Sequence, residues 1–155
     1  MCVTSFTACG GDDDDDDLPG QEVKSSVTYY EPCLDWGSTP AHVKAYMSGW
    51  KLDENSNDYG LLYSNDSNTI TVAYGFLDSR NGLSIVDVTY NNSNVNNIVS
   101  EIQKRYNMTL TKKDDPDLKE GDALYLGYGT IGGRNIAVLL HSTGATVRVV
   151  YDIPD

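Results

Sequence analysis

Two stretches of the chain repeat apolar side chains at intervals of three and four residues. The first places them at Val43, Tyr46, Met47 and Trp50, and the second at Val95, Ile98, Val99, Ile102 and Tyr106. This spacing is typical of a helix that buries one face. Ser38 is positioned to cap the start of the first helix, and Asn94 that of the second. Gly49 and Asn107 suit the left-handed backbone that often ends a helix.

Six further stretches are rich in β-branched and aromatic residues, and several alternate apolar with polar positions. This composition predicts strands. Three follow the first helix, at residues 59–64, 69–76 and 83–90, and three follow the second, at residues 123–130, 135–142 and 146–153. The polar segment 111–122 is expected to be a connection between the second helix and its strands.

Each half of the chain, about residues 35–92 and 93–155, is therefore expected to be one helix followed by three strands. One helix over three strands buries little apolar surface by itself. We therefore expect both units to share one antiparallel sheet, with the two helices on one face. The fold class is α+β, and 155 residues suit one domain, placed at residues 27–155.

The first seventeen residues have a composition of their own. A small residue precedes Cys9, and two glycines and an acidic run follow it, at Gly10, Gly11, Asp12, Asp13, Asp14, Asp15, Asp16 and Asp17. This arrangement resembles the processing site of bacterial lipoproteins. The acidic run after Cys-Gly-Gly is similar to the surface-export signal of Bacteroidetes-type lipoproteins, many of which have no assigned role.

The resemblance implies that the thiol of Cys9 is lipidated and that the peptide before it is removed. Residues 1–8 would be the remnant of a signal peptide, and residues 9–26 a disordered acidic tether. Only eight residues, without Lys or Arg, precede Cys9, so we expect the true start codon to lie upstream of Met1. Two or three acyl chains anchor a domain firmly, at about 0.8 kcal/mol per buried CH₂.

The implied location is the outer membrane, at the cell surface or on the periplasmic face. A cytosolic protein with an acidic tail is the alternative that the residues leave open. The formal net charge of −12 excludes a nucleic-acid partner, because no basic stripe is present to neutralise phosphates.

Motifs for chemistry are few, and the sequence indicates no enzyme, cofactor or metal site. His42 and His141 lie far apart without ligand spacing around them. The glycine pattern at 127–132 falls between two predicted strands and opens no helix, which favours a hairpin over a dinucleotide site. Cys33 lies beside Leu34 and Trp36, so we expect a small buried hydrophobic residue rather than a nucleophile.

The sheet face opposite the helices remains as a binding surface. By alternation we assign six residues to this face: Leu62, Thr71, Tyr125, Leu139, His141 and Arg148. Tyr125, His141 and Arg148 are the candidate binding residues, since tyrosine and arginine are enriched at binding hot spots. An ordinary half-solvated sheet is the alternative.

A second resemblance concerns the repeated unit. The segment Gly37-Ser38-Thr39, the helix positions Val43 and Tyr46-Met47, and strands ending in Tyr resemble the unit of small outer-membrane-assembly lipoproteins. A tandem of such units is similar to secreted β-lactamase-inhibitor proteins. We therefore expect a non-catalytic envelope lipoprotein that binds a protein or glycan through its sheet face. A periplasm-facing assembly or inhibitor lipoprotein is the alternative, and a hydrolase is the third hypothesis.

Overall fold

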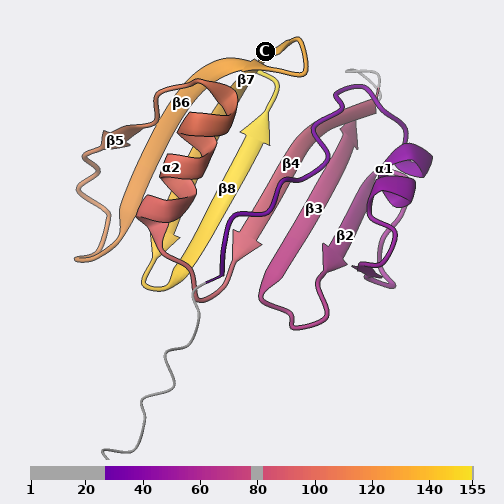
Figure 1. Cartoon of the computed structure of the whole chain (residues 1–155), viewed down its shortest axis with the longest axis horizontal. Coiled ribbons are helices and arrows are strands. Elements are labelled where there is room, and N and C mark those ends of the chain that lie inside the picture. The colour runs from indigo at the N-terminus through magenta and orange to yellow at the C-terminus, as the bar shows by residue number, and fades with distance from the viewer. Residues whose placement is uncertain (1–26, 78–81, 155) are drawn as a thin grey trace, which may run out of the picture.

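The sheet dominates the computed structural model, which describes residues 27–77 and 82–154 (Figure 1). Along the chain the elements are α1 (Pro40–Tyr46), β1 (Lys51–Leu52), β2 (Gly60–Ser64), β3 (Ile70–Leu77), β4 (Gly82–Tyr90), α2 (Val95–Tyr106), β5 (Thr111–Lys113), β6 (Ala123–Ile131), β7 (Arg134–Thr143) and β8 (Thr146–Asp152). The eight strands form one antiparallel sheet in the order β1-β2-β3-β4-β8-β7-β6-β5. This confirms the α+β class. Cys9 and the acidic run lie outside the described residues.

The six predicted strands are all present, and two short edge strands were not predicted. β5 pairs Thr111–Lys113 with Leu124–Leu126 of β6, so the prediction that 111–122 is only a connection is wrong at its first three residues. All three β5 residues are exposed. An edge strand that buries no side chain leaves no periodic signal in the sequence, which is why pattern alone missed it.

The termini of α2 follow their local chemistry, whereas α1 ends at Tyr46 with Met47 as its C-cap, so the expected end at Gly49 is wrong. Asn94 caps α2 by accepting from the backbone N–H groups of Asn96 and Asn97, and Asn107 ends it in the left-handed region at φ 48°. The expected cap of α1 is wrong by one residue: Thr39, rather than Ser38, accepts from the N–H of His42. The Ser38 carbonyl is engaged by the N–H of Leu83 at 3.0 Å, which ties Ser38 to β4.

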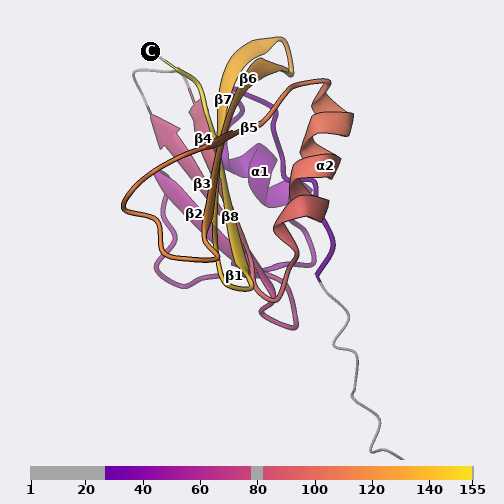
Figure 2. The same ribbon diagram turned by 90° about the vertical axis from the view of Figure 1, so that its left-hand side faces the viewer.

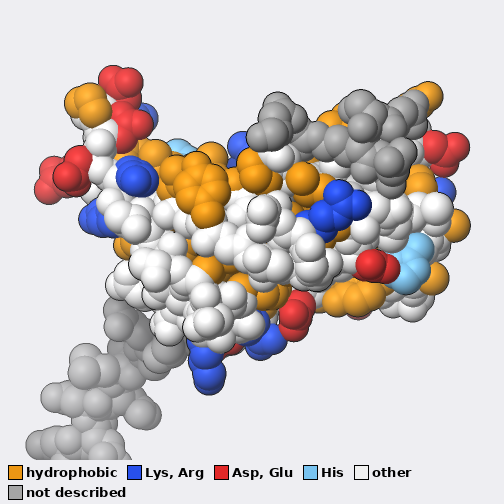
Figure 3. Space-filling view, turned by 90° about the horizontal axis from the view of Figure 1, so that it is seen from above, with side chains coloured by type: hydrophobic (Ala, Val, Ile, Leu, Met, Phe, Trp, Pro, Cys, Tyr) orange, Lys and Arg blue, Asp and Glu red, His pale blue; other side chains and the backbone are white. Residues whose placement is uncertain are grey.

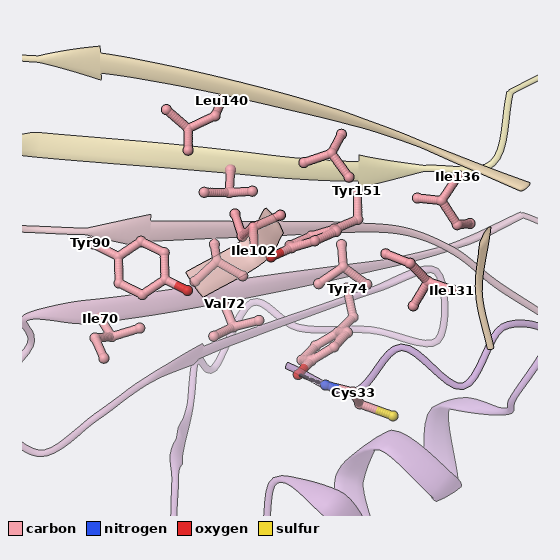
Figure 4. Close-up of a cluster of buried hydrophobic side chains, with 14 of the residues drawn as sticks. Cys33, Ile70, Val72, Tyr74, Tyr90, Ile102, Ile131, Ile136, Leu140 and Tyr151 are labelled. Carbon is pink, nitrogen blue, oxygen red and sulfur yellow. Dashed lines mark hydrogen bonds between the residues drawn. The ribbon is translucent and has the colours of Figure 1, made fainter. Parts of the chain in front are cut away.

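One buried core joins residues of both helices to the inward side chains of the strands. Its centre is a cross-strand row in which Val72, Val88, Val149 and Leu140 follow one another on β3, β4, β8 and β7. All four are fully buried, as is Ile102 of α2. Figure 4 shows Val72, Leu140 and Ile102 within this cluster. Because β4 pairs with β8, the core continues across the junction between the two halves of the chain.

The segment before α1 is held against this core by tyrosine hydroxyls. Tyr90 donates to the carbonyl of Tyr30 at 2.9 Å, and the hydroxyl of Tyr74 accepts from the N–H of Cys33 at 3.1 Å. Figure 4 shows Tyr74 reaching from β3 toward Cys33. Cys33 is 3% exposed, which confirms its expected place as a small buried residue. Residues 27–36 therefore form a strap that crosses the sheet between α1 and α2 (Figure 1).

Candidate functional site: the open sheet face

The strand residues that alternate with the core residues form a second sheet face, which we call the open face. The register places Thr71, Thr89, Arg148, His141 and Leu124 in one row across β3, β4, β8, β7 and β6. Arg148 and His141, both predicted as binding residues, are direct cross-strand partners in this row. The side chains of such partners lie close enough to contact one ligand together.

Tyr125 lies on the other face, so its assignment to the open face is wrong. It pairs with the fully buried Leu140 and packs against the core. The next inward positions of β6 are Gly127 and Gly129, which leave room for the chain that follows α2. A Cβ atom on Gly127 would lie 2.6 Å from the carbonyl oxygen of Thr109. Inward glycines hide the alternation of the strand, and a shift of one residue exchanges the two faces.

An ion pair joins the two central strands on the open face. The Nε of Arg148 donates to both carboxylate oxygens of Asp87, at 3.1 and 2.9 Å, and its Nη2 donates to Oδ2 as well. Hydrogen bonding by Asp87 raises the pKa of the Arg148 guanidinium above its ordinary value, so this group stays charged. The Arg148 side chain is 59% exposed and that of Asp87 only 23%. Arg148 therefore presents its charge to the solvent from an anchored position.

Sequence reasoning did not identify Asp87 as a site residue. It lies in β4 between the buried residues Val86 and Val88. The signal that the sequence offered was a carboxylate placed directly between two valines of a predicted strand. Its diagonal relation to Arg148 follows only from the pairing of β4 with β8, which sequence patterns do not specify.

Two hollows flank this ion pair, and Arg148 lines both. The first, of about 310 Å³, lies toward β2 and β3 and includes Leu62 and Asp87. The second, of about 250 Å³, lies toward β6 and β7 and includes Leu139 and Leu118. Leu62 is 39% exposed and Leu139 41%. The open face thus combines threonines and exposed leucines with one ion pair at its centre.

The connection between β5 and β6 forms a raised rim beside the second hollow. It supplies Asp115 and Leu118 to the lining, and it projects on the side of the sheet opposite α2 (Figure 2). Residues 114–122 hold five carboxylates and one lysine. Figure 3 shows acidic side chains gathered at this projecting end of the molecule. A ligand on the open face therefore meets negative charge at this edge.

Within 27–77 and 82–154, no group of three or more His, Cys, Asp or Glu side chains is placed to hold a metal ion. His42 contacts Asp35, at 3.1 Å, and lies apart from His141 and Arg148. Neither α1 nor α2 is long and apolar enough to span a membrane.

Comparison of the chain with protein-family models, with curated proteins and with solved structures finds no match.

Proposed function

We propose that this chain is a non-catalytic lipoprotein of the cell envelope that binds a protein partner through the open face. The observation that carries the proposal is the Arg148–Asp87 ion pair between two hollows, each of which includes exposed leucine side chains or threonine methyl groups. An arginine at the centre of an apolar patch is typical of a protein-binding hot spot. Among the described residues that line the two hollows there is no Phe, Tyr or Trp to stack on a sugar ring, which favours a protein over a glycan on this face.

The charges at the rim indicate the chemistry of the partner. Asp114, Asp115 and Asp117 stand on the raised connection beside the second hollow, and the chain as a whole carries a formal charge of −12. The partner's contact surface is therefore expected to be an apolar strip flanked by lysine or arginine side chains, because opposite potentials across an interface favour association.

The membrane part of the proposal rests on the sequence before residue 27. Cys9, followed by Gly10, Gly11 and the run Asp12–Asp17, supports lipidation and export to the cell surface. The periplasmic face remains the alternative location.

The finer architecture is also part of this proposal: two repeated helix-plus-strand units, with both helices on one face of the sheet. The sheet order supports it, because β1 to β4 and β5 to β8 each run from an edge to the centre. The last strands of the two halves meet there, with Val88 of β4 opposite Val149 of β8. Helix residues of both halves, Val43 and Ile98, also belong to one buried cluster.

Location is tested by labelling cells that express the full-length gene with a palmitate analogue and then treating the intact cells with protease. We expect label on the wild type, none on Cys9→Ala, and digestion of the domain from outside. Label with protection from protease would place the domain in the periplasm and favour an assembly or inhibitor role. A wild-type chain without label would contradict the anchor.

The binding face is tested by placing a photo-crosslinking amino acid at position 139, which is 41% exposed. Position 59, where Tyr59 is 70% exposed, is the matched control. We expect a discrete adduct from position 139 that disappears when Arg148→Ala is added, and none from position 59. Equal adducts from both positions, or an adduct that survives Arg148→Ala, would argue against the open face.

A further inference from the structure

A second concave site lies away from the open face, on the side of the sheet that carries the strap. This helix-side cleft has a volume of about 580 Å³. Its walls are the strap residues 31–35, His42 and Tyr46 of α1, the end of α2 at Arg105 and Tyr106, and the end of β6 at Thr130 and Ile131. The volume falls within the range of about 300–1,000 Å³ that is typical of ligand pockets.

One carboxylate in this cleft is held in place from two sides. Arg105 donates from Nη1 to Oε2 of Glu31 at 2.9 Å, and the hydroxyl of Tyr106 donates to Oε1 at 3.4 Å. Arg105 is itself positioned, because its Nε donates to Glu101 at 3.1 Å and its guanidinium lies 4.9 Å from the ring centre of Tyr29. The side chain of Glu31 is still 51% exposed. It is therefore an ordered acceptor with solvent access.

The second carboxylate is Asp35, at the other end of the same strap segment. Asp35 is 3.1 Å from Nε2 of His42, and its side chain is 66% exposed. Tyr46 lines the same cleft, and its hydroxyl donates to the backbone carbonyl of Glu31 at 3.1 Å. The Tyr46 residue is 48% exposed, so the cleft offers a tethered aromatic ring beside two ordered carboxylates.

These groups match the polar hydroxyl edge and the apolar C–H face of a sugar ring. A carboxylate accepts about four hydrogen bonds, so Glu31 and Asp35 keep acceptor capacity for vicinal hydroxyl groups. A tyrosine ring offers a flat apolar surface that can cover the C–H face of a pyranose. Burial raises the pKa of Tyr46 and, to about 12, that of Tyr106, which keeps both phenols neutral hydrogen-bonding groups near pH 7.

We propose that the helix-side cleft binds an uncharged saccharide, with Tyr46 covering the ring face and Glu31 and Asp35 accepting from its hydroxyls. Besides His42, the lining holds two carboxylates and one guanidinium, so it offers an anionic sugar no excess of positive charge. The site is separate from the open face and does not depend on a protein partner there.

The experiment is saturation-transfer NMR on the full chain with four uncharged trisaccharides: maltotriose, cellotriose, mannotriose and tri-N-acetylchitotriose. Trigalacturonate is the anionic comparison. We expect at least one uncharged trisaccharide to bind, and Tyr46→Ala and Glu31→Gln each to weaken that binding at least tenfold. Tyr59→Ala and Glu54→Gln are the matched controls outside the cleft, and both should bind as the wild type does.

Three results would overturn the inference: no uncharged trisaccharide binds the wild type, the cleft variants bind unchanged, or trigalacturonate binds more tightly. Thermal unfolding shows whether each variant is folded, and His42→Ala replaces any cleft variant that is not. Arg148→Ala is expected to bind saccharide normally. Loss of saccharide binding in that variant would link the two sites and contradict a separate cleft.

Discussion

Arg148 of β8 and Asp87 of β4 form their ion pair across the two strands at which the halves of the chain meet. The two residues are 61 positions apart in the sequence. Their contact therefore exists only when both halves have joined into one sheet. It marks the centre of the open face, and it lies between the two hollows that we assign to a protein partner.

The first prediction concerns the strength of this ion pair. Because Arg148 is 59% exposed, we expect a double-mutant cycle with Arg148→Ala and Asp87→Asn to give a coupling free energy of about 0.5–1 kcal/mol. Urea unfolding of the wild type, the two single variants and the double variant measures it. A coupling of about 3 kcal/mol would mean that the pair stabilises the fold and is not held mainly for recognition.

The second prediction separates the two faces of the sheet. Tyr125→Ala should lower the free energy of unfolding by about 2 kcal/mol, because this side chain packs against the core. It should leave partner crosslinking at the open face intact. Leu139→Lys should do the opposite: it should change stability by less than about 1 kcal/mol and abolish the partner complex. Urea unfolding and co-precipitation on the same samples compare the two variants.

The third prediction tests the close approach of the chain to β6. Gly127→Ala would place a Cβ atom 2.6 Å from both the carbonyl oxygen of Thr109 and Cδ2 of Leu110. We expect a loss of about 2 kcal/mol or more in the free energy of unfolding, since backbone must move to relieve the overlap. In Gly60→Ala the nearest atom is 3.9 Å away, and stability should change little. Equal stability of the two variants would contradict the packing described.

The fourth prediction concerns alkaline pH. Desolvation by burial raises the pKa of Tyr106 from 10.0 to about 12, and burial raises those of Tyr29 and Tyr151 as well. The folded state therefore holds these protons more tightly than the unfolded chain does. The contribution of these tyrosines to the free energy of unfolding is complete below pH 10. It is lost as the pH rises from about 10 through 12.

Urea unfolding at pH 8, 10 and 11, in buffers of equal ionic strength, measures this effect. Tyr106→Phe removes one of the three groups, so its stability should fall less steeply above pH 10. A wild-type stability that is constant from pH 8 to 11 would show that the hydroxyl cluster around Tyr29 is open to solvent.

Local pattern was sufficient for most secondary structure. Ile98 and Ile102 recur at helical spacing, and both are fully buried on α2. Asn94 and Asn107 bound that helix because capping depends on the nearest backbone groups. The same reasoning found the six long strands, since their side chains bury alternate positions. It missed β5, whose three residues are all exposed, and it misplaced the cap of α1, where Ser38 is held by β4.

The two candidate sites depend on long-range pairing. His141 and Arg148 were assigned correctly to the open face because β7 and β8 alternate cleanly. Tyr125 was not, because Gly127 and Gly129 obscure the alternation of β6. The helix-side cleft had no sequence signal: Glu31 and Arg105 are 74 residues apart, and the strap alone brings them together.

The sequence by itself determined the positions of α2 and of the six longer strands, most of their buried residues, and the lipoprotein-like pattern at Cys9. The reason is that periodicity and capping are short-range effects, decided within a few residues. Only the tertiary structure decided that β4 lies beside β8, and therefore that Asp87 contacts Arg148. Strand order and register depend on which distant apolar faces pack together, and that information belongs to pairs of segments rather than to any one of them.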